Sequence, residues 1–273
     1  MKPGRLAVKD AGLWPPRPGF ESPPGYYDGY SGWALLTELV YQSDSYLREI
    51  EARVVNLAGS KVYLDKTIFH PKSGGVDNDK GFIFKDSFSV RVESVYYDRE
   101  TGDIAHEITG EPQLNPGDIV KLVLDWDRRY RLMRLHTAAH IISAIMYNDF
   151  HALITGGNVS PDYAYDDYSL EAMDKTVFQR AIEKANGVVK KALEVKVYWL
   201  PYDEAMRIPG IVKLASRAPP RVEKLRIVEI PGVDIQADGG PHVKNTAEIG
   251  EIELIKVENK GKGKKRLYFT VKP

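Results

Sequence analysis

The chain has 273 residues, of which 43% are hydrophobic and 28% charged, and its 38 basic and 38 acidic residues cancel. This composition is typical of a globular protein with enough apolar mass for one large domain or two of ordinary size. The chain contains no cysteine, which excludes disulfides, thiolate catalysis and cysteine-based zinc fingers.

Targeting signals and net charge indicate where the protein acts and which partners it can bind. We find no apolar run of membrane-spanning length and no signal segment, so we expect a cytoplasmic protein with no membrane partner. Because the net charge is zero, a nucleic acid would have to bind a local basic face. Only 8 Asn and 4 Gln accompany abundant Glu, Lys and Arg, a pattern that predicts a thermophilic source.

The first half of the chain has the signals of short strands. Residues 1–35 form an extension rich in Pro, Gly and Tyr, which excludes long helices and central strands there. In residues 36–127, strand-like runs alternate with turns. The runs are residues 54–58, 61–65, 81–84, 89–92 and 119–124. Many short strands at even spacing predict a small barrel or sandwich.

The pattern changes after residue 127. Apolar residues at helical spacing predict a helix over 128–147 with Asp127 as its N-cap. A second helix is predicted over 174–193, then a strand over 195–200 and a short helix capped by Asp203. The remainder is rich in strands, which we place at 226–230, 249–258 and 266–271. Helices followed by antiparallel strands predict an α+β domain over residues 128–273.

Four residues have the spacing of a metal site. His136 and His140 share one helix face, because residues i and i+4 lie one turn apart. Asp238 and His242 flank Gly239 and Gly240, whose backbone can approach a ligand closely. Zinc accepts both imidazole nitrogen and carboxylate oxygen, so these residues predict a zinc-dependent hydrolase. Without a metal, the histidine pair is a surface feature or a satisfied core pair, and Asp238 forms an Asx turn.

Three motifs resemble the editing domain of alanyl-tRNA synthetase, and in particular its free-standing relatives, the AlaX family of trans-editing proteins. They are V-Y-L-D-K-T-I-F-H-P-K-S-G-G-V-D-N-D-K-G at 62–81, H-T-A-A-H at 136–140 and D-G-G-P-H-V-K-N-T-A-E-I-G at 238–250. The similarity covers roughly residues 40–273, with the order and spacing of the motifs preserved.

The resemblance implies an α+β fold class: a small N-terminal β-barrel over 36–127, followed by a zinc-binding editing core over 128–273 that threonyl- and alanyl-tRNA synthetases share. It implies hydrolysis of the ester that joins serine, and as a further candidate glycine, to alanine-specific tRNA. It also implies that Zn²⁺ is held by His136, His140, His242 and Asp238.

The resemblance further implies roles in substrate binding and catalysis. Thr155 lies where relatives place a hydroxyl near the zinc, and it is expected to bind substrate and assist catalysis. The alternative is a loop threonine before a turn at Gly156 and Gly157. Gly74, Gly75, Gly239 and Gly240 are expected in the pocket wall, although Gly74 and Gly75 also suit a plain hairpin turn. Asp238 either ligates the ion or acts as a general base.

This chain departs from the family pattern at three positions. Asp238 stands where many relatives have cysteine, which makes the fourth ligand a harder carboxylate. Val76 replaces the glutamine that usually follows the glycines of the barrel motif, so an apolar side chain stands where an amide is expected. Pro241 replaces a threonine and removes a backbone donor.

Other function classes remain open on the sequence alone. A tRNA-binding module with a structural metal site is the main alternative to a deacylase. An unrelated zinc hydrolase lacks support, because Thr137 occupies the place of the glutamate in H-E-x-x-H. tRNA contact is expected through two basic clusters, which are residues 128–134 and 260–266.

Overall fold

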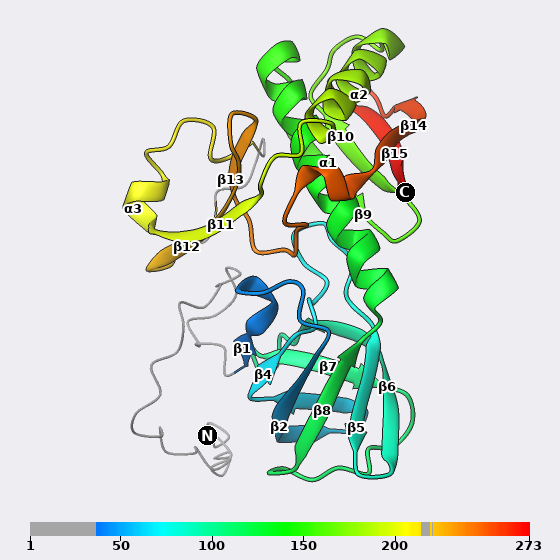
Figure 1. Ribbon diagram of the computed structural model, residues 1–273, viewed down its shortest axis with the longest axis vertical. Coiled ribbons are helices and arrows are strands. Elements are labelled where there is room, and N and C mark those ends of the chain that lie inside the picture. The colour runs from blue at the N-terminus through cyan, green and yellow to red at the C-terminus, as the bar shows by residue number, and fades with distance from the viewer. Residues whose placement is uncertain (1–36, 214–218, 220) are drawn as a thin grey trace, which may run out of the picture.

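The computed structural model describes residues 37–213, 219 and 221–273. The predicted extension, residues 1–35, lies outside that part of the chain. A barrel occupies one end of the molecule, helices and open sheets occupy the other, and the long helix α1 joins them (Figure 1). No helix in the described ranges is long and apolar enough to cross a membrane.

The barrel is closed by strands from residues 49–124. Its strands follow one another in the order β2-β3-β7-β6-β5-β8 around the barrel. Their bounds are β2 (Glu49–Ala58), β3 (Lys61–Leu64), β5 (Gly81–Lys85), β6 (Phe88–Tyr97), β7 (Ile104–Ile108) and β8 (Ile119–Leu124). Alternate residues of β8, namely Val120, Leu122 and Leu124, are buried, as the two-residue period of a strand requires. The strand-rich pattern therefore produces the small barrel among the folds that the sequence predicted.

A short segment next to the barrel forms a separate two-stranded sheet. Strand β1 (Glu38–Leu39) pairs in parallel with β4 (Lys66–Thr67), and the 3-10 helix η1 (Val40–Gln42) follows β1 directly. Tyr41 and Gln42 of η1 are buried. Tyr41 packs in the barrel core, while Gln42 donates to the Gly239 carbonyl and accepts from Arg226, so this segment contacts both halves of the chain.

Helix α1 (Trp126–Phe150) is the centre of the second half. Its N-cap is Asp125, whose carboxylate accepts a hydrogen bond from the Arg128 amide. The predicted cap, Asp127, is therefore wrong and lies inside the first turn. Asp125 directly follows Leu124, the last residue of β8, and keeps the extended backbone that an N-cap residue requires. From residue 132 to 146 every side chain of α1 is buried, so the helix is packed on all sides.

An antiparallel sheet and a second helix cover α1. The sheet has the order β14-β15-β10-β9, with β9 (Ile154–Val159), β10 (Ala164–Tyr168), β14 (Glu251–Asn259) and β15 (Lys265–Lys272). Helix α2 (Lys175–Val189) is capped by Asp174 and ends four residues before the predicted boundary. The sequence did not predict β9 and β10. Gly156 and Gly157 of β9 suggest a turn, but a Cβ at Gly157 would lie 2.4 Å from the Asp166 carboxylate of β10.

A smaller sheet flanks the other side of α1. Its order is β11-β12-β13, with β11 (Lys196–Pro201), β12 (Lys224–Ile230) and β13 (Asp234–Ala237). Helix α3 (Tyr202–Ala205) follows β11, and its N-cap is Pro201 rather than the predicted Asp203, which lies in the first turn. The 3-10 helix η2 (Thr246–Ile249) precedes β14. Strand β13 leads directly into the loop that carries Asp238 and His242.

A buried arginine of α1 fastens the barrel to the second half. Arg129 is fully buried, and its guanidinium donates to the Asp79 carboxylate and to the carbonyls of Ser45 and Ile68. Arg134, by contrast, donates to the Ile249 carbonyl and so contributes a contact within the second half. A guanidinium in a fixed network such as that of Arg129 orients two packed units relative to each other.

Candidate metal centre

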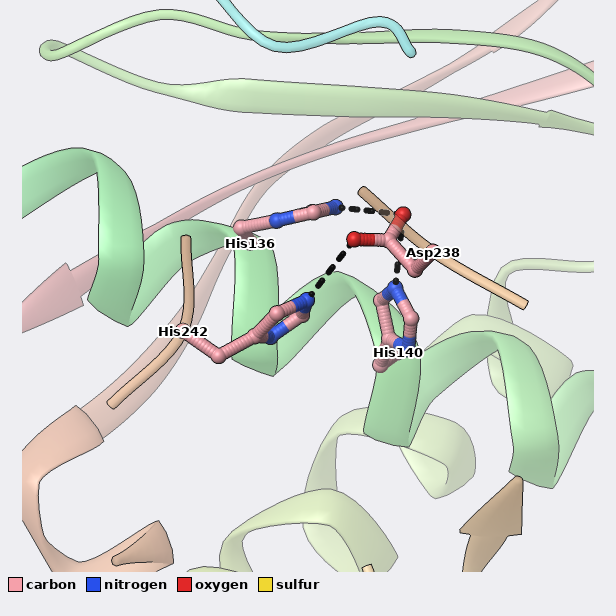
Figure 2. Close-up of side chains that lie close together, drawn as sticks. All are labelled: His136, His140, Asp238 and His242. Atoms are coloured by element: carbon pink, nitrogen blue, oxygen red, sulfur yellow. Dashed lines mark hydrogen bonds and ion pairs between the residues drawn. The ribbon is translucent and has the colours of Figure 1, made fainter. Parts of the chain in front are cut away.

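Two elements bring the four predicted ligands together. Helix α1 presents His136 and His140 one turn apart, and the loop after β13 supplies Asp238 and His242. One ligand atom from each of the four lies within 4.8 Å of the others. Figure 2 shows the three imidazoles gathered around the carboxylate of Asp238. The i, i+4 argument for the histidine pair thus holds in three dimensions.

Asp238 lies at the centre of this group. Its Oδ1 is 3.2 Å from His242 Nε2, and its Oδ2 is 3.6 Å from His136 Nε2 and 3.8 Å from His140 Nε2. The rings of His136 and His242 stack with centroids 4.2 Å apart. All three histidines are buried. Each therefore directs its Nε2 atom into the same small space.

The opposite ring nitrogen of two histidines is held by an oxygen that can only accept. His136 Nδ1 lies 3.3 Å from the Pro241 carbonyl oxygen. His140 Nδ1 lies 3.0 Å from Oδ2 of Asp234, whose pKa is lowered despite its burial, chiefly by His140. Since a carbonyl and a carboxylate donate no proton, both Nδ1 atoms carry the hydrogen.

The third histidine is oriented by a hydroxyl. Thr137 Oγ1 donates to the Met133 carbonyl at 2.9 Å, so it can only accept at its contact with His242 Nδ1, 3.0 Å away. His242 therefore also carries its hydrogen on Nδ1. In their neutral forms all three histidines offer an Nε2 lone pair beside a carboxylate, and one cation among them would satisfy all of these acceptors. The donor set accordingly fits a divalent metal ion.

Burial and charge set the protonation of the group. Burial lowers the pKa of His242 to about 4, and burial together with His242 lowers the pKa of His136 well below its usual value. Burial also acts against protonation of His140, but hydrogen bonds to Asp234 and Asp238 outweigh it and raise that pKa to about 9. Burial would raise the pKa of Asp238, yet the surrounding imidazoles hold it well below its usual range.

A second layer of polar residues supports the ligands. Asp234 pairs with buried Lys213 at 2.6 Å and accepts from Gln236 at 2.9 Å. Buried Arg226 donates to the carbonyls of Asp238 and Gly240 at 2.8 and 3.0 Å. These residues were not predicted from the sequence. The available signal was the polar alternation at residues 234 and 236 on β13, just before Asp238.

Gly240 gives the loop its close approach to α1. A Cβ at this position would lie 2.7 Å from His136 Cε1. The Gly240 amide donates to Asp238 Oδ1 at 2.7 Å, which is an Asx-type contact between residues i and i+2. Asp238 therefore forms the turn considered in the sequence analysis and also lies in the metal-ligand group.

A pocket opens beside the ligand group, between the barrel and the second half. Its lining residues are Tyr41, Gln42, His70, Ser73, Gly74, Val76, His136, Asp238, Gly239 and Gly240. Three of the predicted pocket glycines, Gly74, Gly239 and Gly240, are in this lining.

Two other predicted substrate contacts lie elsewhere. Gly75 is outside the lining, and its carbonyl accepts from the Val159 amide at 2.7 Å. Thr155 is exposed on β9, where its hydroxyl donates to the Asp167 carbonyl at 3.2 Å. The structure therefore does not bring Thr155 to the ligand group.

The predicted basic clusters are largely engaged in internal contacts. In the first cluster, Arg128 donates to the Asn78 carbonyl and Arg131 to the Pro161 carbonyl, in addition to the buried Arg129 and Arg134. In the second, Lys264 and Arg266 both pair with Asp167. The first cluster is therefore a structural fastening and is not an open phosphate-binding face.

Comparisons with known proteins place this geometry in context. Residues 225–268 match the family described as threonyl and alanyl tRNA synthetase second additional domain, and residues 36–128 match tRNA synthetases class II (A). The alanyl-tRNA editing protein AlaX-M of Saccharolobus solfataricus is 54% identical over 87% of this chain and 100% of its own length. AlaX-M of Methanosarcina barkeri is 40% identical over 86% and 99%. AlaX-L of Pyrococcus horikoshii is 35% identical over 86% of this chain and 58% of its own length.

Proposed function

The chain belongs to the AlaX family of alanyl-tRNA editing proteins, and we propose that it is a zinc-dependent deacylase of mischarged alanine tRNA. Its expected substrates are seryl and, as a further candidate, glycyl esters of that tRNA. The observation that carries this proposal is the pocket itself, because its lining combines His136 and Asp238 with residues of the barrel segment. An ester held in this pocket lies against the ligand group.

Zinc is the proposed ion because of the donor set. Three imidazole nitrogens and one carboxylate oxygen suit Zn²⁺, whereas Mg²⁺ and Ca²⁺ prefer oxygen ligands alone. His136, His140 and His242 would hold the ion, with Asp238 as a fourth ligand. When bound, zinc supplies a Lewis acid that polarises an ester carbonyl or a water molecule.

The protein's own residues orient the reaction. The Nδ1 contacts with Pro241, Asp234 and Thr137 hold the three imidazoles in one tautomer, so no ring has to rotate before the ester binds. Asp238 remains ionised at neutral pH. It can therefore accept a proton from an attacking water whenever it is not occupied as a ligand.

Selection between esters follows from size and hydrogen bonding. A pocket that selects alanine for attachment cannot strongly reject serine, because one added hydroxyl changes its binding only modestly. An editing pocket reverses this by offering a partner that only the hydroxyl satisfies. A separate deacylase with such a partner removes serine that has been attached to alanine tRNA in error.

We propose that two units form the deacylase, a barrel over residues 36–127 and an editing core over residues 128–273. The barrel contributes Ser73, Gly74 and Val76 to the pocket, and the core contributes the ligand group. Two backbone hydrogen bonds hold the barrel loop on the core, one from the Asp77 amide to the Val159 carbonyl and one from the Val159 amide to the Gly75 carbonyl. Separation of the units would therefore remove one wall of the pocket.

The test is hydrolysis of seryl-charged alanine tRNA by the wild type and by His140→Ala. We expect the variant to lose at least about 100-fold in kcat/KM, since a metal ligand is removed. His151→Asn is the matched control, because His151 lies beyond the end of the same helix in a left-handed conformation that Asn tolerates. A wild type that binds tRNA without hydrolysing it would support a tRNA-binding module with a structural metal site instead.

A further inference from the structure

The pocket has a polar wall on the barrel side that the metal ligands do not use. His70 follows β4, is 1% exposed and packs edge-on against Tyr41 with ring centroids 5.3 Å apart. Ser73 follows three residues later, and both residues line the pocket together with Asp238. A hydroxyl and an imidazole therefore lie across a small pocket from the ligand group.

A tight turn fixes the position of Ser73. Ser73 and Val76 exchange two backbone hydrogen bonds, of 3.2 and 2.8 Å. The two residues between them, Gly74 and Gly75, have φ of +59° and +82°, the left-handed pair that a type I′ turn requires. These two glycines are therefore needed for the shape of the turn, and larger residues there would be strained.

The turn is also docked on the editing core. The Gly75 carbonyl accepts from the Val159 amide at 2.7 Å, and the Asp77 amide donates to the Val159 carbonyl at 2.9 Å. Val76 forms a parallel bridge with Val159 of β9. Ser73 consequently has a defined place relative to the core.

The hydrogen bonds of His70 give the Ser73 hydroxyl a direction. His70 Nδ1 lies 3.4 Å from the Asp77 carbonyl, so Nδ1 carries the hydrogen and Nε2 is the acceptor. Ser73 Oγ lies 3.4 Å from that Nε2 and therefore donates to it. Burial lowers the pKa of His70 to about 4, which keeps Nε2 an acceptor at neutral pH.

We propose that Ser73 recognises the hydroxyl of a seryl ester, with His70 as the residue that positions it. Because the Ser73 proton points at His70, the Ser73 oxygen is left to accept a hydrogen bond from the substrate hydroxyl. An alanyl ester offers a methyl group at this point and gains nothing from it.

Two other pocket residues are weaker candidates for this role. Val76 is apolar and buried, so it offers no hydrogen-bond partner. The Gln42 amide donates to the Gly239 carbonyl at 3.4 Å, which directs it along the loop of the ligand group. Ser73 is therefore the residue whose direction best suits a substrate hydroxyl.

The inference rests on the proposed deacylase function, and its test compares seryl- and alanyl-charged alanine tRNA as substrates. We expect Ser73→Ala to lower the ratio of the two kcat/KM values about 10-fold, the effect of one hydrogen bond. Ser73→Thr, which keeps the hydroxyl, should restore most of that ratio. His70→Phe keeps a ring against Tyr41 but removes the acceptor, and it should lower the ratio about threefold. Ser94→Ala, a half-buried serine of β6 outside the pocket lining, is the matched control.

The outcomes separate this inference from the function on which it rests. A wild type that hydrolyses neither ester would contradict the proposed function itself. A wild type that prefers the seryl ester, with the same preference in Ser73→Ala, would overturn the role of Ser73 alone. A loss of preference in Gln42→Met together with an unchanged ratio in Ser73→Ala would move the recognition to Gln42.

Discussion

Gly240→Ala tests whether the loop after β13 and helix α1 are fitted to each other around a metal ion. The added Cβ would lie 2.7 Å from His136 Cε1, 3.0 Å from its Nδ1 and 3.3 Å from Asp238 Oδ1. The nearest of these contacts is about 0.7 Å shorter than the 3.4 Å at which ordinary van der Waals contact begins. One substitution therefore pushes against two of the four proposed ligands.

The His136 ring has no room to withdraw. It stacks on His242 at 4.2 Å and meets His140 edge-on at 4.9 Å. We therefore expect zinc affinity to fall by about 10- to 100-fold, the usual cost of disturbing a ligand's support, or about 1.4–2.8 kcal/mol.

Competition with a chromophoric chelator measures this affinity, and circular dichroism checks that the variant is folded. Gly187→Ala is the matched control, because a Cβ on this residue of α2 meets nothing within 4 Å. A folded Gly240→Ala protein that binds zinc within about twofold of the wild type would refute the packing argument.

Three further perturbations test other parts of the structure. Asp234→Asn should weaken zinc binding about 10-fold, because His140 loses its carboxylate partner. The same variant should lose about 3 kcal/mol of stability in urea unfolding, because Lys213 is left buried without its counter-charge. Affinity and stability equal to those of the wild type would contradict this. In the barrel, burial opposes ionisation of Asp98, but the hydrogen bond from Lys61 holds its pKa at about 2. Its contribution to stability is thus full above the unfolded pKa of about 4 and is lost as pH falls toward 2, and Asp98→Asn should flatten thermal unfolding against pH in that window. Thr155→Val should hydrolyse the seryl ester within about threefold of the wild type, and a loss above tenfold would restore the predicted contact near the metal.

The sequence predicted those parts of the structure that follow from local spacing. His136 and His140 lie together because four residues make about one helical turn. Helix α2 begins at Lys175, next to its predicted start at residue 174, because apolar residues recur there at helical spacing. The short strands of the barrel follow from alternating runs between turns, a pattern that a sandwich shares. Each of these features depends on neighbours within a few residues, whereas closure of the barrel depends on the pairing of β2 with the distant strand β8.

The remainder depends on partners that are far apart in the chain. His140 and Asp234 are 94 residues apart, and no local pattern predicts that pairing. The arginines at 128–134 suggest a basic surface, but their partners are carbonyls and carboxylates contributed by distant segments. In the sequence, Gly156 and Gly157 suggest a turn. In the structure they lie in a strand, where the absence of a side chain leaves room for Asp166 of the neighbouring strand.

Zinc-dependent editing is tested most directly by deacylation of seryl- and alanyl-charged alanine tRNA with the intact protein, the chelated protein and the protein resupplied with zinc. We expect hydrolysis that prefers the seryl ester, disappears on chelation and returns with zinc. A folded, zinc-loaded protein that hydrolyses neither ester, or one whose activity is the same after chelation, would contradict it.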